Sequence, residues 1–190
     1  MEEKELISQI ISKNDQAFKE LVDLYAGRVH NTVVSFTQND EDAEDITQDV
    51  FVEIYQSISK FRNDSSLFTW IYKIAVSKSL DYLKAKKRKK RFSFFTSLFG
   101  EDASLVYDKP HFDHPGVLLE NKEYAKVLFH AISKLPEKQQ TVFTLHKVEG
   151  LSYQEIAEVI QVSTSSVESL MFRAKQNLQI HLKDYYENNF

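Results

Sequence analysis

Three clusters of polar residues could carry chemistry or bind a charged partner. The acidic stretch DEDAEDITQD covers residues 40–49, the loop FRNDSS covers residues 61–66, and the basic run KAKKRKKR covers residues 84–91. Carboxylates this close together could bind a divalent cation, whereas lysine and arginine side chains in a run bind the phosphates of nucleic acids. The clusters therefore indicate either a metal site or a nucleic-acid interface.

The acidic stretch lacks the spacing of a calcium-binding loop. In a loop that begins at Asp40, Asp45 stands where a glycine is needed for the sharp turn, and Phe51 stands where a bidentate glutamate is needed. No base or nucleophile follows nearby to make a catalytic site with these carboxylates. The motif HFDH at residues 111–114 could also supply metal ligands, but no further ligand follows it. We therefore predict no metal site, no cofactor and no enzyme activity.

The basic run opposes the charge of the rest of the chain. The net charge is −4, and without the seven positive charges of residues 84–91 it would be −11. Cations at the C-terminal end of a helix complement the helix dipole, but two or three are enough for this stabilisation of about 0.3–1 kcal/mol. Each phosphate that a lysine or arginine neutralises releases condensed counterions. The run is therefore predicted to hold DNA without reading its sequence.

The composition favours a helical protein. The chain has 190 residues, 42% of them hydrophobic, and only four glycines and three prolines, so long stretches run without a helix breaker. It has no cysteine, which excludes disulfides and thiolate metal sites. The N-terminal sequence MEEKELISQI lacks the basic and then apolar pattern of a signal peptide, and no apolar stretch of about eighteen residues is present to span a bilayer. We expect an all-α protein in the cytoplasm.

Apolar residues recur with helical spacing in the first half of the chain. The spacing predicts helices over residues 17–36 and 41–57, and a third from Leu67 into the basic run. Asp15 is a candidate N-cap of the first of these helices. Residues 1–91 are therefore predicted to form a helical bundle.

The second half begins with a change of pattern. Residues 92–116 lose the periodicity and contain turn-forming residues, which predicts a linker. Its five phenylalanines would be an aggregation liability in water, so we expect the linker to pack along another part of the protein. Periodicity then returns and predicts a second helical domain over residues 117–190. In this domain Pro136 fits the first turn of a helix that runs to Val148, before Gly150 stops it.

The stretch 152–178 has the pattern of a helix-turn-helix. Ser152 and Glu155 form a capping box at the start of its first helix, and the small residue Ala157 lies where the two helices would meet. The buried positions of the motif are apolar, at Ile156, Ile160, Val162 and Val167. The second helix would then offer a polar face to base edges in a major groove, made of Ser165, Ser166, Ser169 and Arg173. An ordinary helical hairpin is the alternative, and the agreement of separate placements favours the DNA-binding motif.

Both halves resemble one family, the extracytoplasmic-function class of bacterial sigma factors in the sigma-70 superfamily. The resemblance is carried in the first half by DAEDITQDVF, residues 42–51, and FRNDSSLFTWIYKIAVSKSLDYLK, residues 61–84. In the second half it is carried by LPEKQQTVFTLHKVEGLSYQEIAEVI and by the helix that ends in MFRAKQNL. It covers roughly residues 17–90 and 118–182, and the order, spacing and length of the motifs match.

The resemblance implies a fold and a function. It implies a sigma region 2 domain over residues 1–91, a linker over residues 92–116, and a sigma region 4 domain over residues 117–190. Such proteins guide core RNA polymerase to promoters, help to open the DNA, and carry no catalytic chemistry of their own. The resemblance also implies an anti-sigma partner, usually tethered to the membrane, and no small-molecule substrate.

Three binding surfaces follow from the resemblance. The contact with core polymerase is expected at Asp45, Gln48, Asp49, Val52, Glu53 and Gln56. The minus-ten element is expected to contact Arg62, Asn63, Asp64, Ser65, Ser66, Trp70, Lys73, Ser77, Lys84, Lys86, Lys87 and Arg88. The minus-thirty-five element is expected to contact Ser165, Ser166, Ser169, Arg173 and Lys175.

Each surface also has a plainer interpretation. The acidic helix could simply be solvated, although the apolar Val52 within its polar face suggests a surface that another protein covers. Asn63 and Ser65 are expected by resemblance to capture a flipped base of the non-template strand, but the loop residues also suit a turn and a helix cap.

Four residues depart from the family pattern. Ser77 stands where similar sequences usually have asparagine, and Gln161 stands where the turn usually has glycine, so we expect Gln161 in a left-handed conformation. Glu168 and Leu170 stand where many relatives are basic. Glu168 is a candidate partner of Ser165 in a capping box.

Two other classes of function remain as alternatives. A helix-turn-helix regulator that is not a polymerase subunit would bind a defined duplex without polymerase. A nucleic-acid enzyme would use Asp45 and Asp49 with a divalent metal. We also expect the acidic mass of the free chain to weaken DNA binding, and polymerase to separate the two domains.

Overall fold

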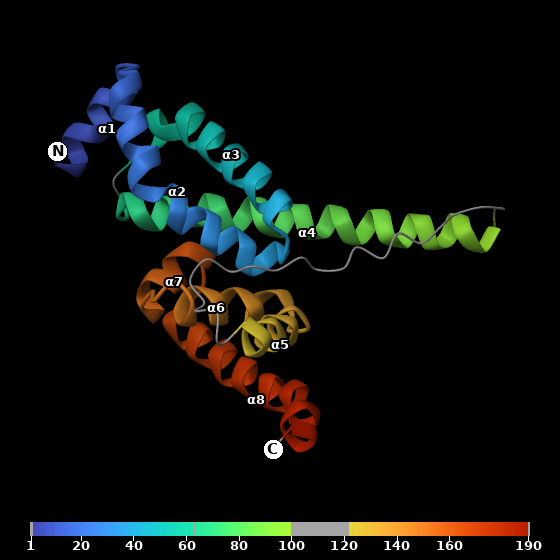
Figure 1. Ribbon diagram of the computed structural model, residues 1–190. Coiled ribbons are helices and arrows are strands. Elements are labelled where there is room, and N and C mark those ends of the chain that lie inside the picture. The colour runs from blue at the N-terminus through green and yellow to red at the C-terminus, as the bar shows by residue number, and fades with distance from the viewer. Residues whose placement is uncertain (1, 63, 100–121, 190) are drawn as a thin grey trace.

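The computed structural model describes residues 2–62, 64–99 and 122–189. This described part is helical and contains no strand, as predicted (Figure 1). Its elements are α1 (Glu3–Ile11), α2 (Asp15–Thr37), α3 (Asp40–Ser57), the 3-10 helix η1 (Ile58–Lys60), α4 (Leu67–Phe99), α5 (Lys122–Ser133), α6 (Glu137–Lys147), α7 (Tyr153–Ile160) and α8 (Thr164–Asn189).

The first domain is a bundle of α1 to α4 around an apolar core. Helix α3, predicted over residues 41–57, buries the apolar residues Ala43, Ile46, Val50 and Ile54, which recur at helical spacing. Helix α1 was not predicted. It buries Leu6, Ile7 and Ile10, and the Glu3 carboxylate accepts a hydrogen bond of 3.2 Å from the backbone N–H of Leu67. The N-terminal segment therefore caps the start of α4.

Helix α2 begins differently from the prediction. Its N-cap is Asn14, whose side-chain oxygen accepts from the backbone N–H groups of Gln16 and Ala17. Asp15, the predicted cap, is instead the first helical residue. Asn14 is the N-cap because its backbone is extended, with φ −79° and ψ 106°, and its side-chain oxygen can therefore accept hydrogen bonds from the first turn of the helix.

Helix α4 continues well past the predicted end of the first domain. It runs through the basic run to Phe99, eight residues into the segment predicted as a linker. No glycine or proline interrupts FSFFTSLF before Gly100, so nothing in the backbone ends the helix earlier. The beginning of the predicted linker is thus helical, and residues 100–116 lie outside the described residues, as does the packing expected for the linker.

The second domain contains α5 to α8. Pro136 is at the N-cap of α6 instead of in its first turn, and its carbonyl accepts from the N–H groups of Gln139 and Gln140. Proline can occupy this position because it has no N–H to leave unpaired. Helix α8 includes the second helix of the predicted helix-turn-helix and continues to Asn189. Its inward side is buried, at Val167 as predicted and also at Met171, Ala174 and Leu178.

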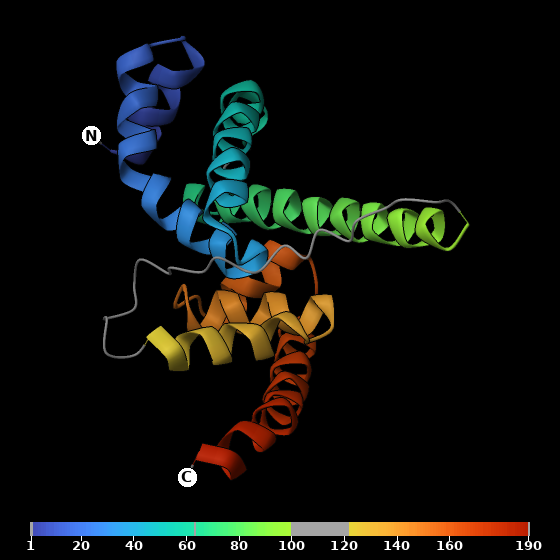
Figure 2. The ribbon, with the colours of Figure 1, turned by 45° about the vertical axis from the view of Figure 1, so that its right-hand side comes forward.

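The two domains pack directly on each other, with α7 against α4 (Figure 2). One hydrophobic cluster joins Phe36, Tyr72 and Val76 of the first domain to residues of α6, α7 and α8. Polar contacts also cross the boundary. The Gln38 side chain donates to the carbonyl of Phe129 at 2.6 Å. The structure is therefore a closed arrangement of the two domains.

Candidate nucleic-acid interface

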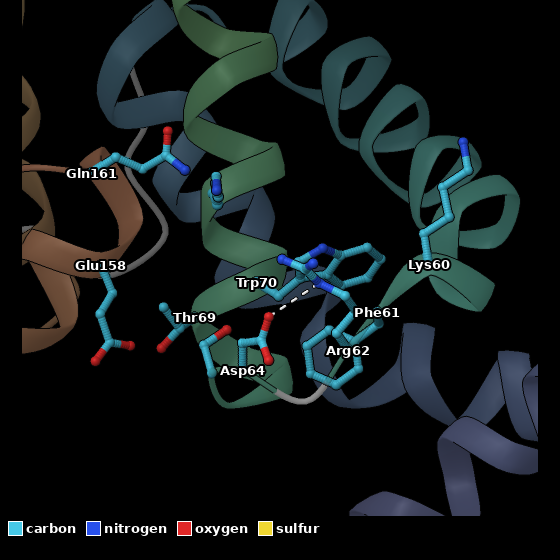
Figure 3. A pocket seen from close by; sticks show the side chains of 10 residues that line it. Lys60, Phe61, Arg62, Asp64, Thr69, Trp70, Glu158 and Gln161 are labelled. Carbon is cyan, nitrogen blue, oxygen red and sulfur yellow. Dashed lines mark ion pairs between the residues drawn. The ribbon is translucent and has the colours of Figure 1, made fainter.

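The loop predicted to bind the minus-ten element lines a pocket of about 510 Å³. The pocket lies between the 61–66 loop, the first turns of α4 and the end of α7, as the close view shows (Figure 3). Its walls combine cations, carboxylates, hydroxyls and one aromatic pair. It is lined by Lys60, Phe61, Arg62, Asp64, Ser65, Thr69, Trp70, Lys73, Glu158 and Gln161.

The aromatic wall of the pocket is a pair of rings. Phe61 and Trp70 lie with ring centroids 5.3 Å apart and planes inclined at 48°. The indole is half-buried and packs against the core of the first domain. A flat, apolar surface held in this way can stack on an unpaired base, and such stacking contributes about 1–3 kcal/mol per base.

The polar groups of the loop lie at the mouth of the pocket. The Arg62 Nε and Asp64 Oδ2 atoms are 3.1 Å apart, and the two side chains are 84% and 70% exposed. A pair so exposed contributes little to stability, so both groups are available to a ligand. Ser65 also lines the pocket. Asn63, which was expected to share base capture with Ser65, lies outside the described residues.

Ser66 has a structural role at the start of α4. Its hydroxyl accepts from the backbone N–H of Thr69 at 3.1 Å and pairs with the Thr69 hydroxyl at 2.9 Å. This is the cap chemistry that we considered as the plainer interpretation of the loop. The structure confirms the cap for Ser66. A role of Ser66 in DNA binding stays a prediction.

The predicted contacts on α4 follow the helix away from the pocket. Trp70, Lys73 and Ser77 lie three or four residues apart, and Lys73 and Ser77 are exposed. In the basic run Lys87 and Arg88 are exposed. Two other cations of the run are paired: Lys84 lies 3.4 Å from Glu137 of the second domain, and Lys86 lies 3.0 Å from Asp42.

Acidic and polar groups of the helix-turn-helix face the minus-ten pocket. Glu158 of α7 and Gln161 at its end complete the wall opposite Trp70 (Figure 3). Gln161 has the predicted left-handed conformation, with φ 55° and ψ 52°. The closed arrangement therefore places a carboxylate in the wall of this pocket.

The helix-turn-helix has the predicted capping box. The Ser152 N–H and hydroxyl donate to the Glu155 carboxylate at 2.8 and 2.7 Å, and these hydrogen bonds lower the pKa of Glu155. The second predicted box is wrong. Helix α8 begins two residues earlier than that box requires, and the hydroxyl of Ser163, not Ser165, accepts from the N–H of Ser166 at 3.2 Å.

The outward face of α8 carries the predicted minus-thirty-five residues. Ser165, Ser169, Arg173 and Lys175 are exposed, and Ser166 is half-buried. Two of the serine hydroxyls form hydrogen bonds at the start of the helix: the Ser165 and Ser166 hydroxyls lie 3.0 and 2.8 Å from the Ser163 hydroxyl. Sequence reasoning missed Phe172, which lies between Ser169 and Arg173 and is 63% exposed. An apolar residue outside the buried stripe was the signal that could have revealed it.

The predicted polymerase surface is the exposed side of α3. Asp45, Gln48, Asp49 and Gln56 are exposed, and Val52 is 53% exposed. Glu53 is 3.6 Å from Lys78 of α4. The prediction omitted Tyr55, which is 42% exposed beside Val52 and packs edge-on against Phe18 at 4.9 Å. An apolar valine and an aromatic ring thus lie side by side on an acidic face.

Two features of the described residues bear on the other functional classes. No group of three or more histidine, cysteine, aspartate or glutamate side chains in them is arranged to hold a metal ion. Among the same residues, no helix combines the length and the apolar character required to cross a membrane. The histidines of the HFDH motif lie outside the described residues.

Comparison with known proteins identifies the family. Residues 21–89 match the model of sigma-70 region 2, and residues 126–178 match that of sigma-70 region 4. The chain is 30% identical over 179 residues to the RNA polymerase sigma-H factor of Pseudomonas aeruginosa. This match covers 92% of this chain and 91% of that protein. It is 31% identical over 173 residues to the ECF RNA polymerase sigma-E factor of Escherichia coli K12, covering 90% of each.

The chain belongs to the extracytoplasmic-function sigma factors. As a sigma factor it directs core RNA polymerase to specific promoters and assists DNA melting in transcription initiation. Solved structures share its fold. The structure of CnrH in complex with the cytosolic domain of CnrY has a TM-score of 0.67 at 23% identity and covers 94% of this chain and 96% of that one. The sigma factor RpoE in complex with the anti-sigma factor NepR from Bartonella quintana has a TM-score of 0.61 at 19% identity. This match covers 87% of this chain and 96% of that one.

Proposed function

We propose that the pocket beside Trp70 receives a base of the minus-ten element when the promoter opens. Flipping a base out of a duplex costs a few kcal/mol and needs a stacking wall and hydrogen-bonding groups at the destination. The juxtaposition of the Phe61–Trp70 pair with the Asp64 and Ser65 side chains in one pocket carries this proposal. The exposed cations Lys73, Lys87 and Arg88 then hold the adjoining backbone by charge.

The exposed side of α3 is the proposed contact with core polymerase. Interface centres are usually aromatic or apolar groups surrounded by polar ones. Val52 and Tyr55 form such a centre, and Asp45, Gln48 and Asp49 surround it. The acidic rim favours a basic surface on the polymerase. The outward face of α8 contacts the minus-thirty-five element in the same proposal, with Phe172 added to the predicted residues.

The closed arrangement is proposed to be the resting form of the free chain. Glu158 lines the minus-ten pocket, and Lys84 is paired with Glu137 of the second domain. Both features oppose binding of an anionic polymer. Core polymerase would hold the two domains apart, and this separation would expose both DNA-binding surfaces. Since a structural neighbour is described as a sigma factor with an anti-sigma factor, we also propose a protein inhibitor for this chain.

In vitro transcription tests the proposal directly. Purified chain and core polymerase are incubated with a randomised promoter library, and the transcripts are sequenced. We expect enrichment of two short elements at the spacing of minus-ten and minus-thirty-five sites. Trp70→Ala should abolish melting of the enriched promoters, measured by permanganate reactivity, while it leaves binding to core polymerase intact. Ile180→Ala, which also truncates an exposed apolar side chain, is the matched control.

Two outcomes would overturn the proposal. Tight binding of a defined duplex by the chain alone, without any effect on polymerase, would instead support a conventional regulator. Metal-dependent turnover of nucleic acid that is lost in Asp45→Ala and Asp49→Ala would support an enzyme, whereas we propose that the chain has no catalytic step of its own. The proposed compartment is the cytoplasm, where core polymerase acts.

A further inference from the structure

One wall of the minus-ten pocket belongs to the second domain and has no part in the proposed contact with promoter DNA. Glu158 and Gln161 come from the end of α7, and Figure 3 shows them on the other side of the pocket from Trp70. In the proposed open form this wall moves away together with the second domain. Glu158 and Gln161 can therefore contact a molecule in the pocket only when the chain is closed.

Gln161 keeps a side chain at a position where the backbone favours glycine. Its φ is 55° and its ψ is 52°, and this left-handed conformation is unfavourable for a residue with a Cβ. A glycine would make the same turn without strain. Strained backbone positions cluster at ligand sites, where the side chain has a function. The Gln161 side chain lines the pocket, so a contact with a ligand there is a reason to keep it.

Four polar side chains of the two walls are free to bind a ligand. Lys60, Lys73, Glu158 and Gln161 line the pocket, and their side chains form no ion pair and no hydrogen bond within the described residues. Three cations and two carboxylates line the pocket in total, which gives it a net charge of +1, whereas the whole chain carries −4. The pocket is thus positive within an acidic chain, and this favours an anionic ligand.

We propose that the closed chain binds a free ribonucleotide in this pocket. The site depends on the proposed function, since the Phe61–Trp70 rings that would stack on a promoter base stack on the base of the nucleotide in the same way. The volume of about 510 Å³ lies within the range of small-molecule sites. The ammonium groups of Lys60 and Lys73 bind the phosphates of the nucleotide.

The second wall selects the sugar. The Glu158 carboxylate accepts hydrogen bonds from the ribose hydroxyls, as acidic residues do in dinucleotide-binding sites. The Gln161 amide can both donate to the nucleotide and accept from it. A deoxyribonucleotide lacks the 2′-hydroxyl and leaves part of this wall without a partner.

The nucleotide favours the closed form of the chain. A ligand that contacts both walls binds the closed form more tightly than the open form, and it shifts the chain toward closure. If it binds only the closed form, a concentration ten times its Kd raises the ratio of closed to open chain about elevenfold. The bound base also takes the place of the flipped promoter base. Free nucleotide and promoter DNA therefore compete for the chain.

The fluorescence of Trp70 tests the proposal, because Trp70 is the only tryptophan in the chain. The full chain without polymerase is titrated with ATP and with GTP. We expect saturable quenching by at least one of the two. The 2′-deoxy form of that nucleotide and inorganic triphosphate should each bind about tenfold more weakly, because each loses hydrogen bonds or stacking that the ribonucleotide makes.

Substitutions in the second wall separate nucleotide binding from promoter melting. Glu158→Ala should bind the ribo and 2′-deoxy forms equally, and Gln161→Gly should weaken binding about tenfold without straining the turn. Both variants should leave promoter melting by the holoenzyme unchanged when permanganate reactivity is measured without nucleotides. Glu168→Ala removes an exposed carboxylate of α8 outside the pocket. It is the matched control and should bind nucleotide like the parent.

Three results would overturn the proposal. The first is unchanged Trp70 fluorescence with both ATP and GTP at millimolar concentrations. The second is quenching by inorganic triphosphate that equals the quenching by the nucleotide. The third is equal affinity for the nucleotide in Glu158→Ala, Gln161→Gly and the parent, which would show that the second wall is not used. If the holoenzyme still melts promoters in any of these cases, the proposed function stands, whereas a holoenzyme that melts no promoter contradicts the proposed function itself.

Discussion

The hydroxyl of Tyr72 is predicted to hold the two domains of the free chain together. Tyr72 of α4 is fully buried and donates to Oε2 of Glu149, between α6 and α7, at 2.7 Å. The other carboxylate oxygen, Oε1, is buried and has no hydrogen-bond partner within the described residues. In Tyr72→Phe the ring remains to fill its site, but Oε2 loses its tyrosine donor.

The expected effect follows from this geometry. A hydrogen bond to a charged group contributes about 1.5–3 kcal/mol, and loss of its donor leaves the carboxylate desolvated in the closed form only. In the open form water can solvate Glu149. At about 1.4 kcal/mol per factor of ten, the ratio of closed to open chain should fall by roughly ten- to a hundredfold.

Single-molecule energy transfer measures this ratio. The chain has no cysteine, so dyes attached to Glu41→Cys on α3 and Gln179→Cys on α8, both exposed positions, report the separation of the domains. We expect a low-transfer population to grow in Tyr72→Phe. The control is Tyr153→Phe, because the Tyr153 hydroxyl makes no hydrogen bond within the described residues and its ring is kept. An identical transfer distribution in Tyr72→Phe and the parent would refute the reasoning, as would a parent chain that is already fully open.

Four further predictions follow from the described contacts. Burial raises the pKa of Glu149 from its ordinary 4.5, although the Tyr72 hydrogen bond and Arg28 oppose the shift. The closed form should therefore be most stable below pH 4.5 and should lose stability as the pH rises through the raised pKa. Glu149→Gln should remove this pH dependence in the energy-transfer assay. Lys87→Gln with Arg88→Gln should reduce the salt slope of DNA binding by about 1.8, read from titrations at several salt concentrations. Val52→Asp should weaken core polymerase binding by about tenfold in a pull-down titration, whereas Gln179→Asp should not. Phe172→Ala should lower initiation about tenfold only at promoters that depend on a minus-thirty-five element.

The fold could be predicted from the sequence wherever one local rule decided the outcome. Helical spacing identified the buried stripes of α3 and α8, and the capping box placed the start of α7 at Tyr153. A helix start was harder to predict where two neighbouring residues could each be the N-cap. Asn14 and Asp15 can both cap a helix, and only the backbone of the preceding turn decides between them. The continuation of α4 to Phe99 was missed because residues 92–99 change composition without a residue that breaks the helix.

Only part of the candidate site could be predicted from the sequence. The sequence predicted the loop and the helix that line the minus-ten pocket, since those residues are close in the chain. It did not predict the opposite wall, which Glu158 and Gln161 contribute from about ninety residues further on. Nor did it predict the pairing of Tyr72 with Glu149, because no periodic pattern indicates which buried tyrosine will meet a carboxylate of another domain.

Closure of the domains and DNA binding compete for some of the same side chains. Lys84 is paired with Glu137 of the second domain at 3.4 Å in the closed form, and a phosphate can take the place of that carboxylate only when the domains part. The side chains are 53% and 42% exposed, so this one pair contributes little to closure. Most of the stability of the closed form must therefore come from the apolar cluster around Tyr72, which DNA does not contact. By linkage, if a partner that binds only the open form raises the affinity for DNA, DNA raises the affinity for that partner by the same factor. We propose that core polymerase is that partner, with α3 as its contact on the first domain.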